Sequence, residues 1–258
     1  MAVVCIGVGE PLRSAADPGR GGLASLDGKP RTKIEFIGKE RAPLVVIDDF
    51  SADPAALVAA AETGARFRSV VGNFYPGVRA PAPEAYLREV IARLEDPLRE
   101  IFGLQGAPLK ASESNFSLVT TPPYLLDPRQ TIPHFDLTDH RMLAVLHYLC
   151  PADRGGTSFY RHRGTGFESI TRQREDPYLM RLAAEMDALG LPPQAYVDGD
   201  TPQFERIAHV DAAFNRLVAY RSVNLHSASI PRDFGFAQDV RKGRLTLNTF
   251  MLFGPAPP

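Results

Sequence analysis

The sequence predicts an α+β fold with a mainly β core, N-terminal packing helices and a helical insert. Three observations predict this class. Two helical patterns precede residue 114, five strand-like runs follow it, and a helical run interrupts those strands between residues 163 and 209. The 23 prolines and 21 glycines among 258 residues require many turns and argue against a helical bundle. A jelly-roll or barrel-like core with helices packed outside it fits this order.

The N-terminal part is expected to supply an arm, two strands and two helices. Residues 11–32 are rich in Gly, Pro and Ser and are interpreted as a loop or mobile arm, and "KIEFIG" (33–38) and "PLVVIDDF" (43–50) as strands. In "SADPAALVAAAETG", Ser51 or Asp53 is the expected cap, Pro54 the first helical residue and Gly64 the exit. A second helix is predicted within 81–103, kinked or restarted at Pro97, because its apolar residues recur at helical spacing.

The C-terminal part is strand-rich. Its expected strands are "NFSLVT", "RMLAVLHYLC", "TSFYRH", "NRLVAYRS" and "RLTLNTFML". Length and pattern predict a single domain over residues 1–258. Its expected parts are an N-terminal arm and first strand (1–42), a supporting strand with helices (43–113), and a β core (114–253) that carries the insert 163–209.

Composition narrows the function classes. A formal charge of −1 gives no electrostatic case for nucleic acid or an anionic membrane, so no such partner is expected. Cys5 and Cys150 lie far apart and are interpreted as reduced thiols. The opening residues lack a basic region, and no stretch approaches transmembrane length. These features predict a cytoplasmic protein.

The stretch "TIPHFDLTDH" (131–140) carries the first candidate for chemistry. His134 and Asp136 lie two residues apart, so on a strand their side chains share one face. Iron(II) oxygenases bind their metal through two histidines and one carboxylate. A His-x-Asp pair is common by chance, and this interpretation therefore needs a third ligand from another strand.

The remaining histidines are the candidates for that ligand. His140 and His147 lie too close in sequence, and His147 sits inside an apolar strand, which favours a structural role. His162 is expected at a strand end facing solvent, and His209 falls within the insert. His226 follows the strand-like run "RLVAYR", where a ligand at a strand terminus is expected, although a surface-loop histidine would look the same.

Several short blocks of the sequence occur in a suggestive order. They are "PLVVIDDFSADP", "HFD", "AVLHYLCPADRGGTSFYRH", "NRLVAYRSVNLHSA" and "GRLTLNTFM". Together they resemble the core of the Fe(II)/2-oxoglutarate-dependent oxygenases, the prolyl-hydroxylase-like branch in particular. The resemblance implies a double-stranded β-helix, which is a jelly-roll or cupin-like core. It also implies His134, Asp136 and His226 as metal ligands and catalytic residues, with Fe(II), 2-oxoglutarate and O₂ as cofactor and co-substrates.

The resemblance also bears on the type of reaction. Related halogenases replace the carboxylate ligand by a small residue, so Asp136 favours hydroxylation or another oxidation.

The resemblance further indicates how 2-oxoglutarate is bound. An arginine is expected to bind the distal carboxylate. Arg244 opens "RLTLNTF" and alternates with leucines, which predicts a polar strand face pointing into the barrel. Its spacing from His226 exceeds the common interval of the family, so Arg232 and Arg241 remain open. Tyr148 matches a strand-end tyrosine that donates to the same carboxylate, or is a core aromatic.

The function that follows is an Fe(II)- and 2-oxoglutarate-dependent dioxygenase. It would hydroxylate an unidentified substrate, either a small molecule or a protein side chain, with release of succinate and CO₂. Two alternatives stay open: a cupin-like metal-binding protein without oxygenase activity, and a catalytically silent interaction domain. The insert 163–209 would serve as a lid over the entrance or as a dimer contact. The primary substrate and the oligomeric state are not determined by the sequence.

Overall fold

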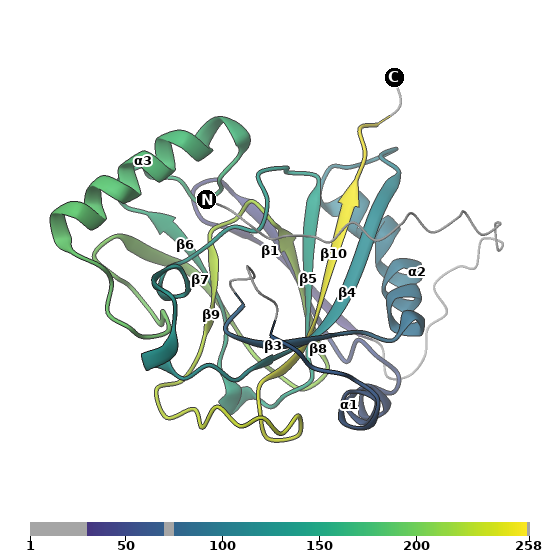
Figure 1. The fold of residues 1–258 in the computed structure, drawn as a ribbon. Helices are drawn as coiled ribbons and strands as arrows, with labels where there is room; N and C mark the ends of the chain where they lie inside the picture. The colour runs from purple at the N-terminus through teal and green to yellow at the C-terminus, as the bar shows by residue number, and fades with distance from the viewer. Residues whose placement is uncertain (1–29, 70–74, 257–258) are drawn as a thin grey trace.

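The computed structural model describes residues 30–69 and 75–256. Within these ranges the chain forms two antiparallel sheets and three α-helices, a mixed α+β fold (Figure 1). Most of the expected arm and Cys5 lie outside the described residues. Within the described residues, no helix combines the length and the apolar character needed to cross a membrane.

The larger sheet has seven strands in the order β1-β2-β8-β5-β10-β4-β3. Every neighbouring pair in it is antiparallel. All five predicted C-terminal runs are strands, and four of them lie in this sheet. Its members are β1 (Arg31–Ile37), β2 (Ala42–Asp48), β3 (Gly77–Pro81), β4 (Leu109–Val119), β5 (Met142–Tyr148), β8 (Arg216–Arg221) and β10 (Leu245–Phe253).

The smaller sheet has the order β7-β6-β9. An isolated antiparallel bridge between His134 and His226 continues this sheet beyond β9, with backbone hydrogen bonds of 2.8 Å in both directions. The 131–140 stretch therefore lies beside β9 although 92 residues separate the two histidines. The strands are β6 (Gly156–His162), β7 (Phe204–Asp211) and β9 (His226–Ser229).

Helices α1 (Pro54–Thr63) and α2 (Glu84–Ile101) lie within the two segments that the sequence predicted to be helical. The Asp53 side chain accepts a hydrogen bond from the Ala56 amide at 2.9 Å, so Asp53 rather than Ser51 is the cap. Helix α2 continues through Pro97 without a break between Glu84 and Ile101. It buries one stripe of side chains: Tyr86, Val90, Leu94 and Leu98.

The large sheet separates two apolar cores. On β5, Leu143 and Val145 pack with α1 and α2, whereas Ala144, Leu146 and Tyr148 face the opposite side. On that opposite side the small sheet covers the large one, as shown by the Phe159 ring of β6 lying 5.0 Å from that of Tyr220 on β8. The order of layers is thus helices, large sheet, small sheet, and the space between the two sheets can hold a ligand.

The insert differs from its predicted limits. It contains α3 (Arg172–Leu189), as expected, but its last residues form β7, which pairs along the whole of β6. The run "FERIAHVD" buries only its ends, so its apolar content is too low to distinguish it from a loop by pattern alone. Residues from Phe204 onward consequently belong to the core of the fold.

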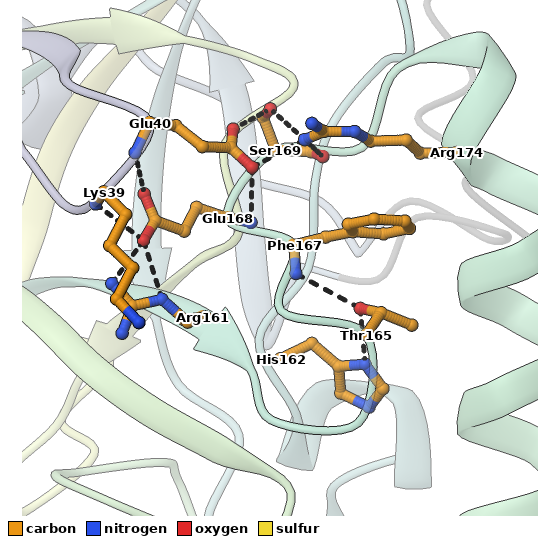
Figure 2. Close-up of polar contacts among 9 residues, drawn as sticks. All are labelled: Lys39, Glu40, Arg161, His162, Thr165, Phe167, Glu168, Ser169 and Arg174. Carbon is orange, nitrogen blue, oxygen red and sulfur yellow. Dashed lines mark hydrogen bonds and ion pairs between the residues drawn. The ribbon is translucent and has the colours of Figure 1, made fainter.

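A buried carboxylate ties the β1–β2 turn to the segment that leads into α3 (Figure 2). Glu168 accepts the backbone N–H groups of Lys39 and Glu40, both at 2.9 Å, and the Nε of Arg161 at 2.8 Å. In return, Glu40 accepts the Glu168 amide at 3.1 Å and a guanidinium N–H of Arg174, in the first turn of α3, at 2.6 Å. Burial raises the pKa of Glu168, but these donors outweigh it, so the pKa lies below the ordinary value and the carboxylate stays charged.

Candidate metal centre

Three side chains predicted as metal ligands meet at one point between the sheets. One ligand atom from each of His134, Asp136 and His226 lies within 4.8 Å of those of the other two. The His134 Nε2 to Asp136 Oδ1 distance is 3.8 Å and the His226 Nε2 to Asp136 Oδ2 distance is 3.7 Å. The backbone bridge between His134 and His226 brings the two rings together, and the i, i+2 spacing adds the carboxylate on the same face.

A hydrogen bond to the backbone fixes the orientation of the His226 ring. Its Nδ1–H donates to the backbone carbonyl of Asn224 at 2.8 Å, which leaves the lone pair of Nε2 facing Asp136. A hydrogen bond from the distal ring nitrogen to a carbonyl is the usual arrangement behind a metal-bound histidine. The Asp136 Oδ2 atom is buried and has no hydrogen-bond partner among the described residues. A buried carboxylate oxygen in that state requires a cation or a proton.

Burial sets the protonation of the trio. It lowers the pKa of His226 to about 4 and raises that of Asp136 to about 6, the latter despite the opposing charges of His134 and Arg79. The pKa of His134 is also lowered, by burial and by the neighbouring His226, although half of its side-chain surface is open to the cavity. Both imidazoles are therefore neutral at pH 7 and ready to act as ligands.

The trio opens onto a cavity of about 510 Å³ between the two sheets and α3. The large sheet contributes Ala144, Leu146 and Phe250, and α3 contributes Tyr178, Leu182 and Met186. Most of this lining is apolar, as is typical of small-molecule sites. A second cavity of about 700 Å³, at the end of α2 and the start of α3, contains none of the trio.

Arg244 lies in the same cavity and is 2% exposed. One terminal N–H donates to the Gly156 carbonyl at 2.9 Å, and the guanidinium carbon lies 5.4 Å from the centre of the Tyr148 ring. Its Nε is buried with no partner, and no carboxylate among the described residues pairs with it. A buried guanidinium without an anion is costly, so this position suits an anionic ligand.

The other candidates for the anion lie elsewhere. Arg241 is exposed and pairs with Glu62 of α1, and Arg232 is exposed, so neither lines the cavity. The Tyr148 hydroxyl is 2.6 Å from Thr157 Oγ1, and Tyr148 is absent from the cavity lining. In this structure Tyr148 contacts Arg244 with its ring and holds Thr157 with its hydroxyl.

Three of the four remaining histidines, His147, His162 and His209, have structural partners. His147 is fully buried, with Nδ1 3.2 Å from the Tyr86 hydroxyl and Nε2 3.0 Å from Asn215 Oδ1. His209 lies in β7 beside Ser158 and Asp211. The prediction that His162 faces solvent is wrong, because its side chain is 0% exposed.

His162 instead attaches α3 to the core. Its Nε2 lies 2.9 Å from a carboxylate oxygen of Glu185 on α3. Its Nδ1 lies 3.0 Å from the Thr165 hydroxyl, as Figure 2 shows. The partner carboxylate comes 23 residues later, on another element, which no local pattern reveals. Sequence reasoning also missed Arg79, which lines the cavity from β3.

Comparison with solved structures gives distant likenesses. The carbocyclase SnoK from nogalamycin biosynthesis, described as non-heme and α-ketoglutarate-dependent, is 16% identical over 83% of this chain and 82% of its own, with a TM-score of 0.46. HygX from Streptomyces hygroscopicus, with iron bound, is 13% identical over 84% and 83%, with a TM-score of 0.44. EvdO2 from Micromonospora carbonacea var. aurantiaca is 17% identical over 83% and 89%, with a TM-score of 0.41. At such values a likeness carries no information about the substrate of this chain.

Comparison of sequences gives one family. No curated protein matches the chain. The model of a family of unknown function, DUF6445, matches residues 28–251, which include the trio, Arg244 and both sheets except the last two residues of β10. The chain therefore belongs to the DUF6445 family.

Proposed function

We propose that the chain is an Fe(II)- and 2-oxoglutarate-dependent dioxygenase that hydroxylates a separate substrate. One observation carries this proposal: the same cavity contains a His-Asp-His trio and a buried arginine, Arg244, that has no anionic partner within the described part of the chain. Two imidazoles and one carboxylate on one face are the ligand set of non-heme iron oxygenases. A metal-binding cupin without oxygenase activity has no use for the buried cation.

The donor atoms of the trio fit a divalent iron. The separations of 3.7 and 3.8 Å are below twice a typical metal–ligand bond of about 2.1 Å, and all three ligand atoms lie within 4.8 Å of one another, so small side-chain rotations would bring one ion within reach of all three. Neutral imidazoles and the otherwise unpartnered Asp136 oxygen provide the required lone pairs. His134, Asp136 and His226 would hold the ion from one side and leave its cavity side open.

Arg244 would bind the distal carboxylate of 2-oxoglutarate. Its planar donor fork matches a carboxylate, and the Gly156 carbonyl and the Tyr148 ring fix its orientation before the ligand arrives. When bound, iron, the keto acid and O₂ together supply the oxidising power, with release of succinate and CO₂. The chain contributes binding, orientation and exclusion of water, the last through the apolar side chains of α3.

The pairing of strands supports the finer fold proposal, a double-stranded β-helix. Strands β4, β10, β5 and β8 are consecutive neighbours in the large sheet, and the bridge at His134 adds a fourth member to β9, β6 and β7. Two facing four-stranded arrangements with the trio between them are what this architecture requires. We propose further that residues 1–258 form a single domain of the prolyl-hydroxylase-like branch, and that the part of the insert around α3 acts as the lid.

The proposal is tested by anaerobic titration of the protein with Fe(II) and 2-oxoglutarate. We expect a weak visible charge-transfer band that requires both additions, because the keto acid chelates the iron. Succinate formation on admission of O₂ is the second measurement, with a panel of small organic acids and peptides as substrates. Metal binding without the band would favour the cupin alternative, and absence of metal binding would favour a silent interaction domain.

The pKa values of the trio predict how metal affinity depends on pH. Between pH 4 and pH 6, Asp136 retains a proton that a metal must displace, whereas His226 does not. The affinity for Mn(II) is expected to be constant above about pH 7 and to fall about tenfold for each pH unit below 6. Titrations of Mn(II) followed by electron paramagnetic resonance measure this dependence.

Protonation of the trio also changes the free energy of unfolding, and this effect has to be distinguished from the effect on metal affinity. In the metal-free protein, the raised pKa of Asp136 makes stability fall as pH rises from about 4 to 6, whereas the lowered pKa values of His134 and His226 make it rise between about 4 and 6.5. The two histidine contributions exceed that of Asp136, so the stability of the metal-free chain is expected to rise with pH over this range, and metal affinity is compared only at pH values where the chain remains folded. Loss of affinity with two protons per metal would assign the titration to the imidazoles and contradict the prediction.

A further inference from the structure

The cavity around the trio has an excess of positive charge. Arg79, Arg129 and Arg244 line it, and Asp136 is the one carboxylate among the lining residues that the structure describes. Arg129 forms an ion pair with Asp127, with an Nε to Oδ1 distance of 2.8 Å. The charges of a divalent iron, a doubly charged keto acid, Arg244 and Asp136 cancel. Among the described lining residues, no further negative charge then balances that of Arg79.

Arg79 is held in the cavity by its neighbours in the sheet. It lies opposite Ser117 of β4, which in turn lies opposite Thr246 of β10, so all three side chains share the face that lines the cavity. Its Nε donates to Ser117 Oγ at 3.1 Å, and its guanidinium carbon lies 5.5 Å from the centre of the Tyr75 ring. These contacts orient the guanidinium on an otherwise flexible side chain.

The terminal nitrogens of Arg79 remain available for a ligand. Within residues 30–69 and 75–256, neither makes a hydrogen bond, and no carboxylate lies within ion-pair distance of them. A guanidinium has five N–H donors, and Ser117 uses one of them. The four that remain form a planar fork that matches the two oxygens of a carboxylate.

Most of the remaining cavity surface is apolar, and the polar side chains that also line it are Gln130, Thr157, Ser227, Asn248 and Thr249. Helix α3 presents Tyr178, Leu179, Leu182 and Met186, and Ile132 and Phe250 line other parts of the wall. A cavity of about 510 Å³ is the size of ordinary small-molecule sites. Such a wall favours a ligand whose body is hydrocarbon or aromatic, and a polar sugar or a nucleotide would leave its hydroxyl groups unpaired there.

We propose that the primary substrate of this site is a small monocarboxylate with an apolar body. Arg79 binds the carboxylate, and α3 contacts the body and holds it beside the trio. This inference rests on the proposed function, which supplies the metal and the keto acid. It assigns the two cavity arginines to different ligands: Arg244 to 2-oxoglutarate and Arg79 to the substrate.

The test compares matched acids and amides. Octanoate, 4-phenylbutyrate and 3-cyclohexylpropionate, each with its neutral amide, are titrated calorimetrically into the chain saturated with Mn(II) and 2-oxoglutarate. At least one acid is expected to bind about tenfold or more tightly than its amide, because charge-assisted hydrogen bonds exceed neutral ones. Equal affinities within every pair, or no binding by any member, would overturn the inference.

Variants assign the preference to Arg79. In R79M the ratio between acid and amide is expected to fall below about twofold, while affinity for 2-oxoglutarate changes by less than about twofold. R79K should give an intermediate ratio, because it keeps the charge without the planar donor fork of the guanidinium. R79K is also the variant to be measured if R79M does not fold. R88M removes an exposed arginine of α2 that pairs with Glu84 and should change nothing. A preference that survives in R79M, or a loss of 2-oxoglutarate affinity specific to R79M, would contradict the assignment.

Failure of the proposed function is recognised separately. If Mn(II) and 2-oxoglutarate do not bind, the same pairs are titrated into the metal-free chain and into its R79M and R244M variants. A preference for the acid that disappears only in R79M keeps Arg79 as the carboxylate site. A preference for the acid that disappears only in R244M, or the absence of any preference, would rule out Arg79 as the carboxylate site.

Discussion

The D136A variant is expected to lose metal binding by more than about a hundredfold, and with it all succinate formation. Loss of an outer-shell partner alone typically costs 10–100-fold in metal affinity, and a direct ligand costs more. Asp136 is the carboxylate within the trio and lies 3.7 and 3.8 Å from the two ligand nitrogens, so no other side chain replaces it. Calorimetric titration with Mn(II), Zn(II) and Fe(II) under anaerobic conditions measures the effect.

A second variant at this position, D136N, distinguishes the loss of a metal ligand from damage to the fold. Burial raises the pKa of Asp136 to about 6, so at pH 7 the metal-free protein carries an unpaired buried carboxylate. D136N removes that charge at nearly constant volume and is expected to raise the free energy of unfolding by about 1–2 kcal/mol. Urea denaturation of the metal-free proteins checks this expectation.

A matched control lies three residues away. Asp139 pairs with Arg141 and is outside the cavity around the trio, so D139A should leave metal affinity unchanged. Metal binding that persists in D136A would remove the carboxylate from the site. A loss of stability in D136N would mean that the carboxylate serves the fold and not a cation.

Much of this arrangement is contained in short-range patterns. Asp53, Pro54 and Gly64 define the limits of α1 because caps act within one turn. All seven residues of β5 are buried, and its continuous apolar run bounded by turn residues was enough to predict a strand. The pairing of His134 with His226 was accessible only through the order of the surrounding motifs, because a bridge across 92 residues leaves no local trace.

What sequence reasoning missed depends on contacts between distant elements. Strand β3 has five residues, with Gly77 and Pro81 at its ends, and forms because the edge of β4 is available for pairing. Its Arg79 enters the cavity for that reason alone. His162 is buried because Glu185 arrives from α3 to pair with it. Neither position differs in its local pattern from that of a solvated surface residue.

The R244M variant is expected to weaken 2-oxoglutarate binding by more than about a hundredfold and to leave metal affinity intact. Hydrogen bonds to charged groups contribute about 1.5–3 kcal/mol each, and a carboxylate on this fork forms two. Met fills a similar apolar volume without a charge. The Kd for 2-oxoglutarate, measured by calorimetry on the Mn(II)-loaded protein, tests the prediction.

The free energy of unfolding of R244M provides a second test of the role of Arg244. Arg244 is 2% exposed, and among the described residues its Nε lacks a partner, so the ligand-free chain carries an uncompensated buried charge. Replacing such a charge by an apolar side chain is neutral or stabilising when no ion pair is broken. R244M should therefore unfold at the same or a higher urea concentration without keto acid, and gain less from its addition. R241M, which breaks only an exposed pair with Glu62, should behave as the unaltered chain in both measurements.

An unchanged Kd in R244M would show that the buried guanidinium does not anchor the keto acid. The trio alone could not then distinguish an oxygenase from a metal-binding cupin.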